Sequence, residues 1–429
     1  MHSYRLKYGR ETVEVPYSEQ QLLGIIQSRP EADEKAEEAV VIQALQNPIH
    51  SPRLKEMVKP GEKICIVISD ITRAWQKMSF YLPYIVEELQ AGGIADQDIL
   101  FLSATGSHRN QSEEEHKVLL GEKLYKHFKV IDHDSRDQGN MVYLGTTSYG
   151  TPVKVNKIAL DCDHIVLTGA VVYHDLAGWG GGKKSILPGI SSYESIMANH
   201  ALSLNPEIGM GIHPQVRCGS ALENPVNLDM LEAAAFVNPS FLFNVIINEK
   251  GNIGQAVAGH YVKAHEAGQQ IVDELDSITI GQRADLVIVS AGGYPKDINL
   301  YQASKALVNA KEALKPGGTV ILLSECEEGF GHDEVEDLLL NYENNQEREA
   351  AVRQDYTVSK FIGYLVAEIA AAYQIILVSK ISPEKLAKVN IQGVATLEEA
   401  LQQVETQGKA GQKLYLMPYG ASTLPKWNQ

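Results

Sequence analysis

Short apolar runs alternate with longer amphipathic segments along most of the chain, and this alternation constrains the fold more than any other feature. Runs rich in isoleucine and valine occupy 63–69, 98–104, 163–172, 241–247, 284–291, 318–324 and 374–379. Segments with helical periodicity lie between them, among them 83–91, 304–314 and 360–372. Near-continuous apolar strands separated by helices are typical of parallel sheets covered on both faces. We therefore predict an α/β fold of mostly parallel sheets flanked by helices.

The length of the chain predicts two domains. At 429 residues it exceeds one typical hydrophobic core. Residues 259–275 have the pattern of one polar helix, after which the strand pattern restarts at 284. We place an N-terminal domain at 1–272, a hinge at 273–282 and a C-terminal domain at 283–413. The sequence leaves open whether the tail, 414–429, returns to the first domain.

Charge and composition exclude several classes of protein. The formal net charge is -16, which argues against a general nucleic-acid or anionic-membrane binder because both need a basic surface. Four cysteines without a C-x-x-C pair favour neither a zinc site nor a disulfide framework. The longest apolar stretch, 361–378, is interrupted by Glu368 and Gln374, so we read it as a helix and a strand. We expect a cytoplasmic protein without a signal peptide.

Polar residues follow the predicted strands at the points where they end. They are Asp70, Thr72 and Arg73; Thr105, Gly106, His108 and Arg109; His174; and Tyr301, Gln302 and Lys305. Ligands of open parallel sheets bind outside the carboxyl ends of the strands. Because these ends fall in both predicted domains, we expect one site in the cleft between the domains.

A glycine tract ending in two lysines, 178–184, follows the third of these strands. It is not a P-loop, because the serine comes one residue too late and Pro188 follows closely. It is not a dinucleotide loop either, because Lys183 stands where the third glycine is required. From the residues alone, a mobile loop with solvated lysines remains an alternative to a ligand site.

Single residues in these segments allow a functional and a structural interpretation. His108 and His174 could act as general bases, since imidazole titrates near pH ~6.5, or could be ordinary hydrogen-bonded histidines. His200 could be a metal ligand or a helix-end histidine. Arg73 and Lys305 could bind a carboxylate or lie on the surface. We read 131–137 as a polar loop and not as a metal cluster.

Taken together and in order, these motifs resemble the nickel-dependent lactate racemase family over essentially the whole chain. The central motif runs His174, Gly178, Gly181, Gly182, Lys184, Leu187, Pro188, Gly189, Asn199 and His200. It is joined by Asp70-x-Thr72-Arg73, by Thr105-Gly106-x-His108-Arg109, and by Gly293-Tyr294-Pro295 with Tyr301-Gln302-x-x-Lys305. Each motif alone is weak, and their common order makes the resemblance specific.

The resemblance implies a cofactor that the residues alone do not reveal. Members of this family carry a nickel-pincer nucleotide, a pyridinium-3,5-bisthiocarboxylic acid mononucleotide. Its covalent attachment corresponds to Lys184, and a histidine ligand of its nickel corresponds to His200, so both residues are metal-site candidates. The resemblance places Asp70, Thr72, Thr105, Gly106 and Pro188 near the cofactor. We expect the glycines to let the backbone approach a planar cofactor, with Lys183 as a nearby cation.

The implied reaction is racemisation or epimerisation of a 2-hydroxy acid by reversible hydride transfer. His108 and His174 correspond to the two bases, and Arg73, Tyr301, Gln302 and Lys305 to substrate-binding residues. The default substrate is lactate, with malate, longer hydroxy acids and sugar acids as alternatives. Val358 and Ser359 depart from the family pattern and leave the substrate's side group open. The implied partners are the proteins that make the cofactor and insert its nickel.

Three other readings compete with this one. A pyridoxal-phosphate racemase using Lys184 would leave three histidines unexplained. An NAD-dependent dehydrogenase would need the dinucleotide loop that the glycine tract does not form. A non-catalytic nucleotide-binding or sensor protein with the same fold is the third alternative.

Overall fold

The chain forms two compact units, which differ from the predicted domains in their N-terminal and middle segments. The computed structural model describes residues 2–30, 35–406 and 411–427. Unit 1 consists of Met1–Arg29, Leu204–Pro214 and Leu275–Gln429, and unit 2 of Pro30–Ser203 and Gln215–Glu274. Residues 1–29 and 204–214, predicted within the first domain, belong to unit 1 because their contacts are with its C-terminal residues. The chain passes from unit 2 to unit 1 for the last time between Glu274 and Leu275, within the predicted hinge 273–282.

Unit 2 is built on a six-stranded sheet in which one edge strand is antiparallel. Its order is β13-β12-β9-β4-β5-β6, and only the β12–β13 pair is antiparallel. The strands are β4 (Ile64–Ser69), β5 (Ile99–Ala104), β6 (Lys129–Asp132), β9 (His164–Ala170), β12 (Phe241–Ile247) and β13 (Ile253–Gly259). Small antiparallel pairs are formed by β7 (Met141–Thr146) with β8 (Pro152–Asn156) and by β10 (Tyr173–His174) with β11 (Gly178–Trp179).

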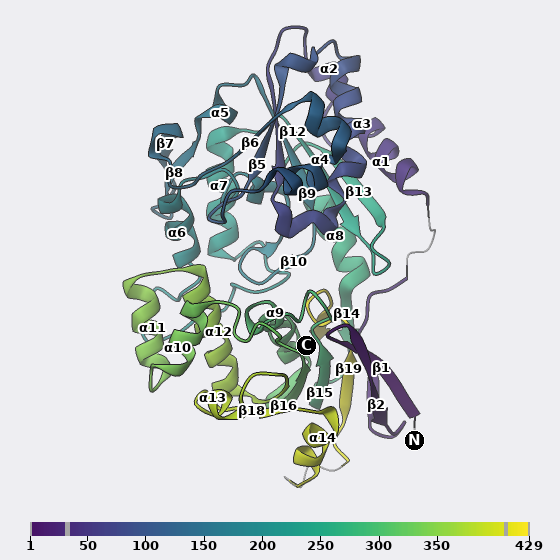
Figure 1. Cartoon of the computed structure of the whole chain (residues 1–429), viewed down its shortest axis with the longest axis vertical. Coiled ribbons are helices and arrows are strands. Elements are labelled where there is room, and N and C mark those ends of the chain that lie inside the picture. Colours follow the sequence, from purple (N-terminus) through teal and green to yellow (C-terminus); the bar gives the residue numbers. More distant parts are fainter. Residues whose placement is uncertain (1, 31–34, 407–410, 428–429) are drawn as a thin grey trace. The chain divides into compact units, whose positions relative to one another are not determined.

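Helices cover this sheet, and short helical turns follow several of its strands. The helices are α1 (Glu37–Gln46), α2 (Leu54–Met57), α3 (Met78–Ala91), α4 (Glu113–His127), α5 (Lys157–Leu160), α6 (Tyr193–Ala201), α7 (Pro225–Val237) and α8 (Lys263–Asp276). The 3-10 turns are η1 (Ile71–Gln76), η2 (Asp96–Asp98), η3 (Gln138–Asn140) and η4 (Gly182–Ser185). Figure 1 shows α3 beside both α1 and α4.

The core of unit 2 explains why β4 is apolar without alternation. Ile64, Ile66 and Ile68 on one face of β4 pack with Tyr81 and Ile85 of α3. Cys65 and Val67 on the other face are also fully buried. A strand covered on both faces loses the in–out alternation of a half-exposed strand.

Unit 1 is built on a second six-stranded sheet, in which every pair is parallel. Its order is β18-β17-β16-β15-β19-β3. The strands are β3 (Leu22–Ile25), β15 (Ala284–Ser290), β16 (Leu314–Leu323), β17 (Gln374–Val378), β18 (Ile391–Val394) and β19 (Leu414–Met417), and a separate parallel pair joins β14 (Ser277–Ile280) to β20 (Leu424–Trp427). The tail from residue 414 therefore stays in unit 1 and does not return to the first domain; residues 428–429 lie outside the described part.

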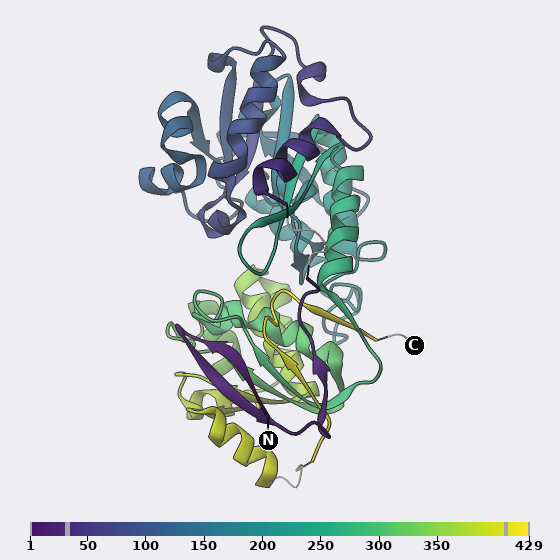
Figure 2. The ribbon, with the colours of Figure 1, turned by 90° about the vertical axis from the view of Figure 1, so that its right-hand side faces the viewer.

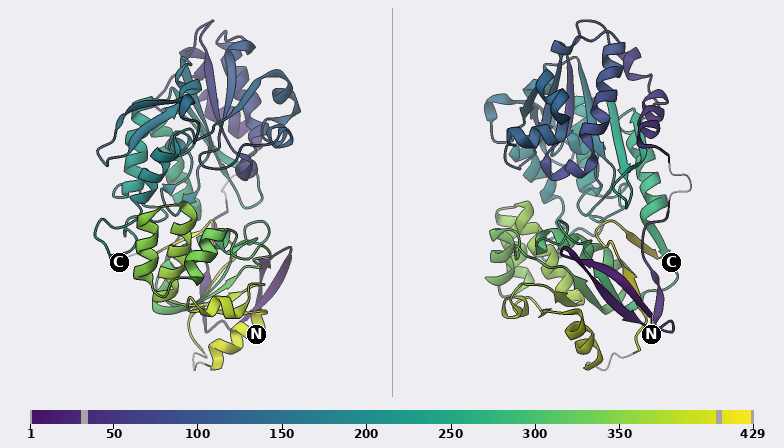
Figure 3. Two further views of the ribbon diagram at one scale, coloured as in Figure 1. Left: turned by 60° about the vertical axis from the view of Figure 1, so that its left-hand side comes forward. Right: turned by 45° about the vertical axis from the view of Figure 1, so that its right-hand side comes forward.

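A hairpin from the start of the chain covers one face of this second sheet. Leu6 of β1 (His2–Tyr8) and Val15 of β2 (Glu11–Tyr17) are buried in one cluster with Leu286 and Ile288 of β15. Figure 2 shows this purple hairpin alongside the green and yellow strands of unit 1. The remaining helical elements are α9 (Leu300–Ala310), η5 (Lys311–Ala313), α10 (Asp333–Leu340), α11 (Asn345–Gln354), α12 (Val358–Ala372), α13 (Pro383–Ala387) and α14 (Leu397–Thr406). The green helices α10 and α11 both pack on α12 (Figure 3).

The predicted fold class is confirmed, and the differences lie in element boundaries. Each predicted strand is present, from β4 to β17. Helix α3 begins at Met78 and contains Pro83, because six buried residues on one face outweigh the single backbone hydrogen bond that proline cannot make. The predicted helix 304–314 is displaced toward the N-terminus, since Leu314 already starts β16. Within the described residues, no helix combines the length and apolarity that crossing a membrane requires. The four cysteines, all among the described residues, form no disulfide bond.

Candidate functional site

Three neighbouring strands of unit 2 carry the predicted site residues at their carboxyl ends. Strand β4 lies between β9 and β5 and is parallel to both. Asp70 follows β4, Thr105 follows β5, and β10 with His174 follows β9. The parallel register therefore places three segments, far apart in sequence, at one edge of the sheet.

Asp70 is the partner of His108, a role that the sequence did not predict. Its Oδ1 accepts hydrogen bonds from Thr72 N at 3.0 Å and Thr72 Oγ1 at 2.5 Å, which caps η1. Its Oδ2 forms a short hydrogen bond with Nδ1 of His108. Burial acts to raise the pKa of Asp70, but His108 and the Thr72 hydroxyl outweigh it and hold the pKa below its usual value. The imidazole is 51% exposed while the carboxylate is 7% exposed, so a buried acid orients an accessible base.

A glutamine beneath this pair fixes the turn that carries Asp70. The Gln111 Oε1 accepts from Ile71 N at 2.5 Å, and its Nε2 donates to Ser103 Oγ at 2.5 Å. Asp132 accepts from Gln111 N at 2.7 Å and contacts His116 Nε2 at 2.8 Å. Gln111 thus links the ends of β4, β5 and β6. A polar residue just after a predicted strand end was the only sequence signal for it.

Thr105, Gly106 and Pro188, which the resemblance places near the cofactor, lie close to one another. Gly106 adopts φ +57°, a left-handed conformation that favours glycine, and its N–H donates to the Gly189 carbonyl at 3.0 Å. A Cβ on Gly106 would lie 3.5 Å from the Pro188 carbonyl oxygen. The Thr105 hydroxyl donates to the carbonyl of His133. His133 is itself fully buried and contacts Ser191 O at 2.9 Å. The predicted loop 131–137 begins within β6, which ends at Asp132.

The glycine tract folds back on the segment that carries His174. In the β10–β11 pair, Tyr173 lies opposite Trp179 and His174 opposite Gly178. The loop then turns through η4 and brings Lys184 Nζ to 3.2 Å from His174 Nε2. The other ring nitrogen, Nδ1, lies 3.0 Å from Asp175 Oδ1 and 3.2 Å from Leu176 N. The imidazole is therefore held from both sides.

The glycines are required by contacts within the protein. A Cβ on Gly178 would lie 2.2 Å from the Ser220 carbonyl oxygen, and one on Gly181 would lie 2.6 Å from Asn244 Oδ1. A Cβ on Gly182 would lie 2.6 Å from the ring of His265. All three glycines also have positive φ values. The expectation that they admit a planar cofactor is thus not needed to explain them, because the protein's own packing already excludes a side chain at each position.

The two adjacent lysines have different surroundings. Lys183 is 1% exposed, and its Nζ has no hydrogen-bond partner among the described residues. Burial, with a smaller effect of Lys184, lowers its pKa to about 7. Lys184 is only partly buried and contacts His174. The predicted nearby cation is therefore an interior amine that loses its charge near neutral pH, whereas Lys184 is the lysine at the catalytic candidates.

His200 has the properties of a ligand-ready imidazole. It lies near the end of α6, a helix capped by Ser192, and is 4% exposed. Burial, with smaller contributions from Lys184 and His174, lowers its pKa to about 3, so it is neutral at pH 7. Its Nδ1 is buried without a hydrogen-bond partner among the described residues. The described residues contain no cluster of three His, Cys, Asp or Glu side chains that could hold a metal ion by themselves.

The remaining candidates, Tyr301, Gln302 and Lys305, share the first turns of α9 in unit 1. The side chain of Asn299 caps this helix by accepting from Gln302 N at 3.0 Å. Lys305 Nζ donates to Gln302 Oε1 at 3.0 Å, so the two polar groups lie on one face. Val358 and Ser359 begin α12 after the cap residue Thr357. The structure thus groups the α9 residues with one another, and it groups the other candidates within unit 2.

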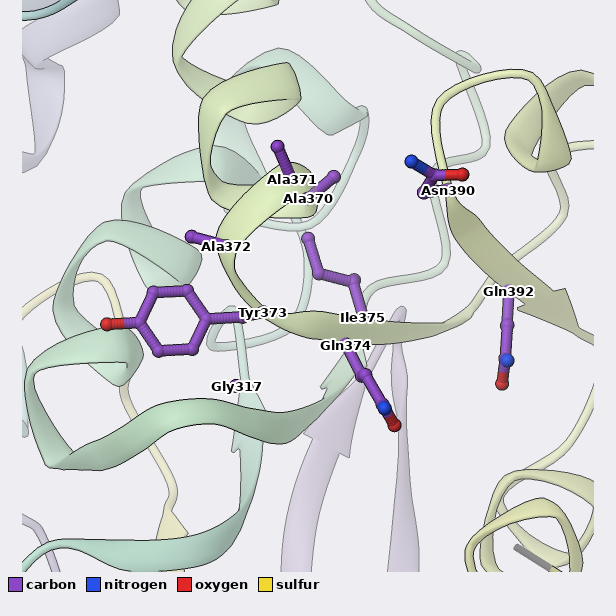
Figure 4. Close-up of a pocket in the computed structure, with 9 residues that line it drawn as sticks. All are labelled: Gly317, Ala370, Ala371, Ala372, Tyr373, Gln374, Ile375, Asn390 and Gln392. Carbon is purple, nitrogen blue, oxygen red and sulfur yellow. The ribbon is translucent and has the colours of Figure 1, made fainter.

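Two cavities in unit 1 are lined by residues other than these candidates. One of about 280 Å³ is lined by the end of α12 and the starts of β17 and β18, including Tyr373 and Asn390 (Figure 4). The other, of about 480 Å³, is lined by the loop Cys326 to Asp333 with Lys380 and Lys385. Its loop contacts α9 through a hydrogen bond from Tyr301 N to Phe330 O at 3.2 Å. Neither cavity is lined by a predicted site residue.

Comparisons with known proteins agree on one family. The model of the lactate racemase N-terminal domain matches residues 8–211, and that of the lactate racemase C-terminal domain matches residues 280–424. The lactate racemase of Thermoanaerobacterium thermosaccharolyticum is 35% identical over 333 residues, covering 77% of this chain and 76% of the relative. The lactate racemase of Lactiplantibacillus plantarum is 30% identical over 434 residues, covering 98% and 99%.

Solved structures show the same relationship. The lactate racemase apoprotein from T. thermosaccharolyticum matches with a TM-score of 0.91 and 31% identity, over 99% of this chain and 100% of that one. A protein from Thermotoga maritima matches with a TM-score of 0.66 and 17% identity, over 93% and 100%. The second match shows a shared fold only.

Proposed function

The chain belongs to the lactate racemase family and is an isomerase of the racemase type, and from this premise we propose that it interconverts the enantiomers of a small 2-hydroxy acid, with lactate as the default substrate. Malate, longer hydroxy acids and sugar acids are the alternatives within the same chemistry. The observation that carries the proposal is the pair of imidazoles, His108 and His174, which follow the two strands on either side of β4 and are held by separate hydrogen-bonding groups. We propose a cytoplasmic location.

We further propose that unit 2 holds a nickel-pincer nucleotide. The group supplies, when bound, a centre that accepts a hydride from C2 of the substrate and returns it. Lys184 would carry the covalent bond, and His200 would contribute its neutral imidazole to nickel. The fit rests on the buried, unpartnered Nδ1 of His200 and on its nearness to Lys184. A protein that offers one such imidazole, and no cluster of three ligands in its described part, suits a metal whose other donors come with the cofactor.

His108 and His174 would move the hydroxyl proton of the substrate. Racemisation needs the proton to be taken and returned on two faces of C2, so two bases are required. Asp70 would hold the ring of His108 at Nδ1 and fix its orientation. Asp175 would hold His174 from the Nδ1 side, which leaves its Nε2 next to Lys184.

The other candidate residues would bind the substrate or line the cofactor. Arg73, whose Nη1 donates to Thr72 Oγ1 at 2.9 Å, would bind the substrate carboxylate with its planar fork. Tyr301, Gln302 and Lys305 would add substrate contacts from α9. Thr72, Thr105, Gly106 and Pro188 would line the cofactor. The proteins that make the cofactor and insert nickel would be the partners of the chain.

Racemisation of C2-deuterated lactate tests the function directly. The protein is expressed with the cofactor-making enzymes, and each enantiomer is followed by chiral chromatography and mass spectrometry. We expect both enantiomers to interconvert with a primary isotope effect and with deuterium kept at C2. Rapid loss of deuterium to water would indicate proton abstraction from C2 and overturn the hydride mechanism. Activity on malate or a sugar acid but not lactate would correct the substrate alone.

The two bases are tested by single variants. His108→Ala and His174→Ala should each slow both directions by about 10²–10⁴-fold, the usual contribution of general acid–base catalysis. His127→Ala is the control, since His127 pairs with Asp96 at the surface. Either variant retaining wild-type rates in both directions would remove that histidine from the mechanism.

A further inference from the structure

Helix α8 presents a buried histidine to the underside of the glycine tract. His265 is 2% exposed, and its Nε2 lies 2.8 Å from the carbonyl oxygen of Gly180. Gly180 lies between His174 and Lys184, the two groups that the tract brings together. No motif in the sequence pointed to His265, which is the one polar residue on a buried helix face with Ala264, Gly268 and Val272.

The tautomer of His265 follows from its two partners. Gln269, one turn later on α8, donates from Nε2 to Nδ1 of His265 at 3.1 Å. Since an amide nitrogen can only donate, Nδ1 is the acceptor and Nε2 carries the proton. The carbonyl of Gly180 can only accept, so His265 donates to it. Burial, with a smaller effect of Lys183, lowers the pKa of His265 to about 3, which keeps the ring neutral.

Close packing makes this contact specific. A Cβ on Gly182 would lie 2.6–2.8 Å from three atoms of the His265 ring, so the tract rests directly on the imidazole. A Cβ on Gly268 would lie 2.8 Å from Val171, so α8 approaches the segment before β10 as closely as a glycine allows. At its far end, α8 receives a hydrogen bond from the Tyr173 hydroxyl to Asp273 Oδ1 at 2.5 Å.

A second group fixes the same tract from the sheet. Asn244 of β12 is fully buried, and its Oδ1 accepts from Gly182 N at 2.9 Å. The tract is therefore held at two points: His265 donates to the Gly180 carbonyl, and Asn244 accepts from the Gly182 N–H. The next residues form η4, which carries Lys184.

We propose that His265 is a positioning residue that fixes the glycine tract from below and thereby sets the distance between His174 and Lys184. The inference rests on the proposed roles of those two residues. His265 is buried, and it acts through the backbone of Gly180 and Gly182. Gln269 acts through His265, because its hydrogen bond to Nδ1 selects the tautomer whose Nε2 can donate to Gly180.

The test compares His265→Leu with His265→Gln and with His260→Leu. Leucine keeps the apolar volume and removes the donor, whereas glutamine can place an amide donor near the Nε2 position. His260 is an exposed histidine that precedes α8 and whose Nδ1 accepts from Val262 N, so its variant is the matched control. The first readout is hydrogen–deuterium exchange of peptides covering 178–186 in protein without cofactor, which needs no activity.

We expect His265→Leu to speed exchange in this segment by about tenfold, the scale of one lost hydrogen bond, and the other two variants to resemble the wild type. In cofactor-loaded protein, His265→Leu should lower the fraction of Lys184 that carries the adduct. It should also lower kcat by about 10–10²-fold with KM nearly unchanged, because misplacement of a catalytic group costs rate. Wild-type exchange in His265→Leu, or a His265→Gln variant as impaired as His265→Leu, would overturn the proposal.

If His265→Leu does not fold, Gln269→Leu replaces it. That change leaves His265 in place and removes the donor that selects its tautomer, so exchange over 178–186 should still rise, by a smaller factor. Unchanged exchange in Gln269→Leu would overturn the tautomer argument. Hydrogen–deuterium exchange is measured without cofactor or substrate, so its result stands even if racemase activity proves absent. A failure of the proposed role of His265 is therefore distinguishable from a failure of the proposed function.

Discussion

The Asp70 carboxylate binds the His108 imidazole at Nδ1, whereas the Nε2 of His174 lies 3.2 Å from the amine of Lys184. The two candidate bases therefore have different neighbours before any ligand binds. A buried carboxylate contacts His108, whereas His174 contacts an amine at Nε2 and the Asp175 carboxylate at Nδ1. Converting the Lys184 amine to an amide-type bond would replace the amine beside His174 with an uncharged group.

Asp70→Asn should lower kcat for both directions by about 10–10²-fold, the usual cost of losing an outer-shell partner. The asparagine oxygen can still accept from Thr72 N, so the turn should keep its fold. The readout is kcat in each direction together with the pH profile of kcat/KM in both proteins. An unchanged rate and pH profile would mean that Asp70 has no influence on His108.

Lys184→Ala should abolish the covalent adduct, as read by the mass of tryptic peptides.

Lys183→Met should keep the adduct on Lys184 and raise Tm. The Lys183 amine has a pKa of about 7 in the folded protein against roughly 10.4 in the unfolded chain. Between these values the unfolded chain binds more protons, so the free energy of unfolding falls as the pH is lowered from about 10.4 to 7. Methionine binds no proton, so the variant does not lose this stability at neutral pH. An adduct found on Lys183 would contradict the assignment of the tether.

His200→Ala should reduce nickel bound per adduct, measured by elemental analysis, while the adduct at Lys184 still forms. The reason is that the imidazole would be a ligand of the metal and not part of the covalent bond. Activity should fall with the nickel content. Equal nickel per adduct in variant and wild type would exclude His200 as a ligand.

Arg73→Lys should raise KM by about tenfold or more, because a charged hydrogen bond is worth roughly 1.5–3 kcal/mol and lysine cannot reproduce the planar fork. Arg109→Lys is the matched control. Arg109 lies beside His108 but is committed to Glu115 by two hydrogen bonds of 2.8 and 2.6 Å. If Arg109→Lys raised KM and Arg73→Lys did not, the carboxylate site would be assigned to the wrong arginine.

Acid should destabilise unit 2 through its two buried neutral imidazoles. His200 and His265 have folded pKa values of about 3 against roughly 6.5 unfolded. Between these values the unfolded chain binds more protons, so stability is complete above about pH 6.5 and falls as the pH is lowered toward 3. Tm should decline from pH 6.5 to 5, and His265→Gln should decline less steeply than His260→Leu. Equal slopes would show that His265 does not titrate on unfolding.

The sequence predicted the strands and the polar residues at their ends, because buried parallel strands and their termini leave a local pattern. It could not predict which strand end faces which. The contact between Asp70 and His108 depends on β4 and β5 being neighbours, which no local pattern encodes. Asn244 was missed because it is a single polar residue within an apolar strand, and His265 because it is one of many polar residues in a helix. In hindsight, a histidine on the buried face of α8 was a usable signal.

The pairing of β3 with β19 sets an order of events during synthesis. Leu22 lies opposite Leu414, so the sheet of unit 1 cannot be completed until nearly the whole chain has left the ribosome. At about 5–20 residues per second, that wait is roughly 20–80 s. Every strand of unit 2 has emerged by residue 259, so its sheet can form first. During the interval, the β1–β2 hairpin exposes Leu6 and Val15, which later lie in the core. The nascent chain is therefore most vulnerable to aggregation and chaperone capture at its oldest end.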